Sequence, residues 1–124
     1  MRRIAFFALT AASLSACSID SLGPSGSVAG TYSLRRINGS TLPYTFSSGS
    51  RLISDDLTLY QDGTFVDVSR YDSGTTSTDQ GLYTSQNGSL SFESSESGLT
   101  YQGSVTDDVL TEEVNGYMQV FERQ

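Results

Sequence analysis

The sequence predicts an all-β protein: a small antiparallel eight-stranded up-and-down barrel that follows an N-terminal signal segment. Three observations lead to this prediction. From Gly30 onward apolar residues alternate with polar ones, which is the period of a half-buried strand. Turn-forming dipeptides such as Asn87-Gly88 and Asn115-Gly116 separate these segments at short, regular intervals. No helical period is visible there, and 124 residues suffice for one domain but not for two.

Residues 1–16 form the predicted signal segment. Two arginines, Arg2 and Arg3, precede an apolar stretch from Ile4 to Leu14. This stretch is too short to span a bilayer and is typical of the apolar region of a signal peptide. We therefore expect residues 1–16 to be absent from the mature protein.

The next feature is the sequence Leu14-Ser15-Ala16-Cys17, which resembles the lipobox of bacterial lipoproteins. The resemblance implies that the chain is cut before Cys17 and that acyl chains such as palmitate on this residue anchor the protein to a membrane. Ser18 follows the cysteine, where Asp would favour retention in the inner membrane in Gram-negative lipoproteins. The resemblance thus implies a cell-envelope location, at the outer membrane and facing the periplasm or the surface. The alternative is an ordinary secretory signal.

Residues 17–29 are predicted to be a lipidated flexible tether, because Ser, Gly and Pro dominate their composition. After cleavage five arginines and fourteen acidic residues remain, which gives a net charge of −9. Anionic headgroups repel such a domain, so the lipid on Cys17 is its expected hold on the membrane. The same charge excludes nucleic acid as a partner.

Residues 30–124 form the predicted barrel domain. Eight strands is a number at which a sheet can close into a barrel with a filled or nearly filled interior. The predicted strands are 30–37, 51–60, 64–71, 80–86, 89–93, 98–106, 109–114 and 117–123.

The first long hairpin is predicted to turn at Asp62-Gly63, read as a two-residue turn. This register places apolar residues opposite one another on a single face, as burial requires. It pairs Leu59 with Val66, Leu57 with Val68, and Asp55 with Arg70.

Three further two-residue turns are predicted at Asn87-Gly88, Asp107-Asp108 and Asn115-Gly116. Their registers again gather apolar residues on one face. The residues expected in the core are Leu57, Leu59, Val66, Val68, Tyr83, Phe92, Leu110 and Phe121. In the last three strands the same registers turn a polar row inward, namely Gly103, Glu112 and Gln119.

The order of strands and turns resembles the small bacterial lipocalin-like domains over residues 30–124. Gly30-Thr31-Tyr32 opens the first strand, Asp62-Gly63-Thr64-Phe65 lies at the first long hairpin, and Val120-Phe121-Glu122-Arg123 ends the chain. Lipocalins carry a Trp on the first strand and an Arg on the last strand that packs across it. The resemblance implies that Tyr32 and Arg123 fill these two positions and close the barrel.

The composition argues against catalysis. Without His or Lys there is no imidazole base, no Ser-His or Ser-Lys pair and no Schiff-base amine. A single Cys forms neither an internal disulfide nor a thiolate zinc site. We expect no enzyme activity, no bound metal and no cofactor, and we expect every acidic side chain except that of Glu112 to lie at the solvated surface.

Glu112 is the predicted polar contact of any pocket, together with Gln119, Gly103 and the inward rings of Tyr101 and Tyr117. An unpaired carboxyl inside the barrel would have a raised pKa, since desolvation disfavours its charged form. If Arg36 or Arg123 reaches it, the pKa would fall instead. The competing prediction is a bulge at Gly103 that turns Glu112 out to solvent.

These features predict a lipid-anchored cell-envelope protein whose lipocalin-like domain binds a small apolar or amphipathic molecule. The alternative is a non-catalytic protein-interaction or structural module with a filled barrel and an exposed contact patch at Tyr60 and Tyr71. The sequence identifies no protein partner. The volume of the cavity separates the two predictions, because ligand pockets measure roughly 300 Å³ or more.

Overall fold

The structure is a computed structural model that describes residues 28–124. The predictions for the signal segment, for Cys17 and for most of the tether lie outside the described residues. The described part of the chain contains strands and turns only. Its elements therefore include no helix that could cross a membrane.

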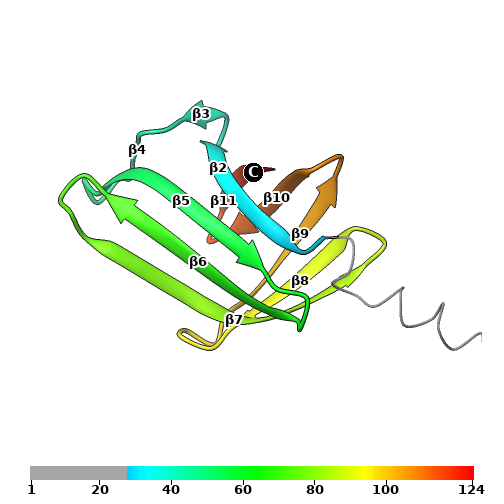
Figure 1. The fold of residues 1–124 in the computed structure, drawn as a ribbon. Coiled ribbons are helices and arrows are strands. Elements are labelled where there is room, and N and C mark those ends of the chain that lie inside the picture. The colour runs from blue at the N-terminus through cyan, green and yellow to red at the C-terminus, as the bar shows by residue number, and fades with distance from the viewer. Residues whose placement is uncertain (1–27) are drawn as a thin grey trace, which may run out of the picture.

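Eight antiparallel strands form a closed barrel in which each strand pairs with its neighbours in the chain (Figure 1). The last strand pairs with the first long one, and pairing of Gly30–Ser33 with Asp56–Leu59 completes the ring. The predicted fold class is confirmed. The strands are β2 (Gly30–Ile37), β5 (Arg51–Leu59), β6 (Thr64–Tyr71), β7 (Thr76–Gln86), β8 (Ser89–Ser94), β9 (Thr100–Thr106), β10 (Val109–Val114) and β11 (Tyr117–Arg123).

Two short strands were not predicted. β3 (Ser40–Thr41) extends the sheet from β2, and β4 (Tyr44–Thr45) pairs with the start of β5. Both belong to residues 38–50, which we call the lid. The lid follows the end of β2 that lies away from Val28 (Figure 1).

Three of the four predicted turn registers are confirmed. Residues at Asn87-Gly88, Asp107-Asp108 and Asn115-Gly116 all have positive φ, as a two-residue turn of type I′ requires. Consequently Tyr83 pairs with Phe92, and Glu112 pairs with both Gly103 and Gln119.

The register predicted from Asp62-Gly63 is wrong by one residue. Only Gly63 has positive φ, and its N–H donates to Tyr60 O at 3.1 Å, so the loop has three residues rather than two. Asp62 Oδ1 stabilises this loop by accepting hydrogen bonds from the backbone N–H and the hydroxyl of Thr64. The pairs are therefore Leu59 with Phe65, Leu57 with Asp67, and Asp55 with Ser69.

The shift changes which side of β6 faces the core. Phe65 is 1% exposed, whereas Val66 and Val68 are only half-buried on the outer side. Asp67, predicted to face solvent, points inward with Phe65. The other predicted core residues are buried, and they join a core cluster made of Val28, Tyr32, Leu34, Ile37, Leu52, Leu57, Leu59, Phe65, Tyr83, Leu90, Phe92, Leu110 and Phe121.

Residues Val28 and Ala29, which precede β2, and Arg123 at the end of β11 close one end of the barrel. Arg123 lies with its guanidinium carbon 5.0 Å from the centroid of the Tyr32 ring, and it also bonds Asp108. Tyr32 donates its hydroxyl to Val28 O, and Arg123 donates to Ala29 O. The packed domain thus includes Val28, two residues before the predicted boundary.

Candidate functional site

Glu112 lies inside the barrel. It is 3% exposed, whereas Glu113 is exposed, and the regular pairing of β9 with β10 leaves no bulge at Gly103. A Cβ on Gly103 would lie 2.6 Å from Thr111 O and 3.1 Å from Glu112 Cβ, so only glycine fits beside this carboxyl. Glu112 Oε1 has no hydrogen-bond partner.

Asp55 and Asp67 bring two more carboxyls to the interior from β5 and β6. Ser69 donates its hydroxyl to Asp55 Oδ2 at 2.7 Å, and the Asp55 and Asp67 carboxyls lie close enough to share a proton. The Oδ1 atoms of both residues are buried, and neither has another hydrogen-bond partner.

Asp79 supplies a fourth inward carboxyl from β7. Ser94 donates to its Oδ1 at 2.5 Å, and Tyr101 donates to its Oδ2 at 2.8 Å. The sequence-predicted pocket residue Tyr101 therefore contacts this layer, but through an acid that was predicted to face solvent. We call Asp55, Asp67, Asp79 and Glu112 the carboxyl layer.

The electrostatics of the layer follow from burial without basic neighbours. Burial, reinforced by the charges of Asp55 and Asp79, raises the pKa of Glu112 to about 8. Burial and the neighbouring Asp55 carboxyl raise the pKa of Asp67 well above its ordinary range. Burial also raises the pKa of Asp55, although its hydrogen bonds oppose the change. Neither Arg36 nor Arg123 forms an ion pair with Glu112, so the raised pKa is the outcome predicted for an unpaired carboxyl.

The lid packs against the barrel end above the carboxyl layer. Tyr44 and Phe46 contact each other and Tyr117 through edge-on rings, with centroids 5.1–6.4 Å apart. Leu42 and Tyr71 pack against the same core. Tyr117 is thus part of the lidded end, and Tyr71, predicted to be exposed, is half-buried there instead.

A groove opens beneath the lid where β2 and β5 separate. Their pairing ends at Ser33 and Asp56, and the space beyond has a volume of about 440 Å³. Apolar walls, hydroxyls and charges all line it, and the lining includes Asp55 of the carboxyl layer. The lining residues are Ser33, Leu34, Arg35, Thr41, Leu42, Ile53, Ser54, Asp55 and Asp56.

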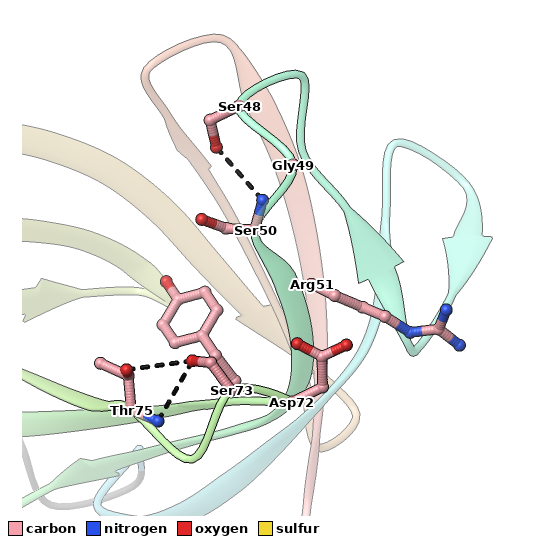
Figure 2. Close-up of a pocket in the computed structure, with 8 residues that line it drawn as sticks. Ser48, Gly49, Ser50, Arg51, Asp72, Ser73 and Thr75 are labelled. Carbon is pink, nitrogen blue, oxygen red and sulfur yellow. Dashed lines mark hydrogen bonds between the residues drawn. The ribbon is translucent and has the colours of Figure 1, made fainter.

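A second pocket of about 430 Å³ lies at the same end, between the lid and the β6–β7 turn. Figure 2 shows the hydroxyls of Ser48, Ser50, Ser73 and Thr75 around it, while the guanidinium of Arg51 extends away from them. Ser48 and Ser73 are held by hydrogen bonds within their own turns. The Tyr71 ring and the charged residues Arg51 and Asp72 also line this pocket, but it contains no residue of the carboxyl layer, whereas the groove contains Asp55.

Metal binding has no support within residues 28–124, where no three acidic or cysteine side chains are arranged to hold an ion. The carboxyl layer accepts hydrogen bonds and positive charge, and the groove walls accept apolar groups. The arrangement is therefore suited to an amphipathic molecule.

Solved structures identify the architecture. The structure is similar to the crystal structure of a lipocalin-like protein from Bacteroides uniformis, with a TM-score of 0.54 and 20% sequence identity over 80% of this chain and 100% of that one. The fold is a lipocalin-like barrel. An uncharacterized protein from Bacteroides eggerthii is also similar, with a TM-score of 0.50 and 16% identity over 77% of this chain and 98% of that one. No family model and no curated protein matches the sequence.

Within this lipocalin-like barrel, sequence reasoning predicted the inward position of Glu112 and its pairing with Gly103 and Gln119, but it placed the inward acids of β5, β6 and β7 at the surface. A repeated pattern would have revealed Asp67. The loops 46–50, 60–64 and 71–75 each read aromatic, any residue, Ser or Asp, Gly, then Ser or Thr. In each, the glycine N–H donates to the aromatic residue's carbonyl and the Ser or Asp oxygen accepts from the last N–H. This pattern indicates a three-residue loop.

Proposed function

We propose that this protein is a lipid-anchored, non-catalytic binding protein of the bacterial cell envelope, whose barrel takes a small amphipathic molecule in the groove between β2 and β5. The observation that carries the proposal is the groove, whose volume of about 440 Å³ suits a small ligand. Leu34, Leu42 and Ile53 offer it apolar walls, and the 5%-exposed carboxyl of Asp55 lies at its inner end.

The position of the groove supports this proposal. The tether enters the barrel at Val28, before β2, and the lid follows the far end of β2. An anchor on Cys17 would thus connect to the barrel at the end opposite the lid, and the flexible tether would leave the groove accessible from the aqueous side.

The test is native mass spectrometry of the full chain, extracted in detergent from its own host. We expect the wild-type protein to retain a small molecule and Ile53→Trp to lose it, because the larger ring fills the groove. Met118→Trp is the matched control, since Ile53 and Met118 are both 43% exposed and Met118 does not line the groove. Retention by Ile53→Trp, or no retained molecule on the wild type, would contradict the proposal.

One observation favours the alternative of a protein-interaction module. Tyr60 and Leu82 are 47% and 58% exposed, and both flank Thr64 on the outer wall of the barrel. If this patch binds a protein, Leu82→Ser should abolish a cross-link seen in intact cells, whereas Ile53→Trp should leave it unchanged.

A further inference from the structure

The carboxyl layer contains no basic partner. Three ion pairs occur in residues 28–124, and they join Arg35 to Glu122, Arg70 to Asp56, and Arg123 to Asp108. All three lie outside the layer, and the chain has neither Lys nor His to supply another cation. The charges of these four inward carboxyls interact, and two serines and one tyrosine donate hydrogen bonds to them.

Glu112 adds an independent observation. It reaches the layer from β10, on a different part of the barrel wall from β5, β6 and β7. Its side chain is buried, its charge interacts with Asp55, Asp67 and Asp79, and its Oε1 has no partner. A buried carboxyl oxygen without a hydrogen-bond partner costs free energy, so a partner brought by a ligand would recover it.

We propose that the carboxyl layer binds the protonated amino group of a small primary amine, whose apolar stem lies in the groove between β2 and β5. This inference rests on the proposed function and specifies the chemical class of the ligand. The ammonium of a primary amine has three donors and no acceptor. Asp55, Asp67 and Glu112 each have one buried oxygen without a hydrogen-bond partner, and Asp55 is the one of the three that lines the groove.

The groove explains how the amine reaches the layer. Asp55 belongs to both, since it lines the groove and its carboxyl lies beside that of Asp67. An ammonium beside Asp55 serves as the positive partner of both carboxyls, and a proton held by the pair is released to solvent when the ammonium binds. The stem then remains between Leu34, Leu42 and Ile53, which line the groove.

The test is calorimetric titration of the full-length protein in detergent with three probes of equal stem length: n-butylamine, n-butanol and n-butyltrimethylammonium. The alcohol lacks the charge, and the quaternary ammonium lacks N–H donors. We expect butylamine to bind about ten-fold more tightly than either, because charge-assisted hydrogen bonds are stronger than neutral ones. Glu112→Gln and Asp55→Asn should each weaken butylamine by about ten-fold and leave butanol unchanged. Glu113→Gln, on the outer face, is the control.

Two results overturn the amine inference. One is butanol binding as tightly as butylamine, which would leave the proposed amphipathic site intact. The other is butylamine binding that neither Glu112→Gln nor Asp55→Asn weakens. A failure of the proposed function itself is seen separately, as a wild-type protein that retains no molecule in mass spectrometry.

Discussion

Glu112 illustrates how one residue type takes its properties from its surroundings. Its neighbour Glu113 is exposed on the same strand, whereas Glu112 is buried with a pKa raised to about 8. Because successive side chains of a strand point to opposite faces, this difference follows from the register of β10 alone. The pair therefore offers an internal comparison at the scale of the residue.

The raised pKa of Glu112 should make the free energy of unfolding fall as the pH rises. The ordinary pKa of Glu is 4.5 and that of buried Glu112 is about 8, so between these values the folded protein holds a proton that the unfolded chain has released. The contribution of Glu112 is fully present below pH 4.5 and is lost as the pH passes 8. We expect Glu112→Gln, which stays neutral, to flatten the dependence and to melt at a higher temperature than wild type above pH 8.

Scanning calorimetry at several pH values measures this effect. Glu113→Gln should follow the wild-type profile, because its carboxyl is exposed. A Glu112→Gln profile parallel to the wild type would show that this carboxyl is not the titrating group. Asp67, whose pKa is also raised, leaves part of the slope in place.

At the scale of the element, the β5–β6 hairpin determines the character of the interior. Its three-residue loop turns Phe65 and Asp67 inward, where a two-residue turn would have turned Val66 and Val68 inward. Both registers bury apolar residues, so the alternating pattern alone does not separate them. The side chain of Asp62, which bonds Thr64, favours the longer loop.

Substitutions in β6 test this register. Phe65→Ala should lower the free energy of unfolding by about 3–5 kcal/mol, since it removes a 1%-exposed ring that packs against Phe92. Val66→Ala should cost about 1 kcal/mol or less, because Val66 is half-buried on the outer side. Chemical denaturation of the two variants gives both values, and a larger loss for Val66→Ala would favour the two-residue turn.

At the scale of the whole molecule, the first described residues, Val28 and Ala29, meet the C-terminal strand at the closed end of the barrel. Arg123 donates to Ala29 O and bonds Asp108, and the carbonyl of Val28 accepts from Tyr32. This end connects to the proposed anchor, and the lidded end is free to meet a ligand. The proposed tether thus joins the barrel at the end away from the groove, so the anchor does not cover the groove.

Anchoring is tested by Cys17→Ser in the native host. We expect wild-type protein in the detergent-extracted membrane fraction and the variant either uncut or released in soluble form, because acyl chains on Cys17 supply the membrane affinity. The net charge of −9 after cleavage gives the domain no compensating attraction to anionic lipid. A cleaved variant that stays in the membrane fraction would contradict the lipid anchor.

The sequence by itself determined the fold class, the strand order and most strand ends. Six of the eight barrel strands have both their first and last residues within one residue of the prediction. Of the other two, β7 begins four residues earlier than predicted and β9 begins two residues later. These features depend on local signals: an alternating pattern and turn residues with positive φ, such as Asn87 and Asn115. The inward direction of Glu112 followed from two such turns.

Only the tertiary structure decided the lid and the carboxyl layer. The lid lacks a regular period, and its aromatic residues find their places by packing against Tyr117 on a strand distant in the sequence. Asp67 turned inward because the loop before it has three residues, and Asp79 lies inward because the longer β7 pairs it directly with Asp67. Barrel closure then brought these acids to Glu112. Alternation assigns a residue to a face, but which faces meet depends on the length of each turn and on the closing of the ring.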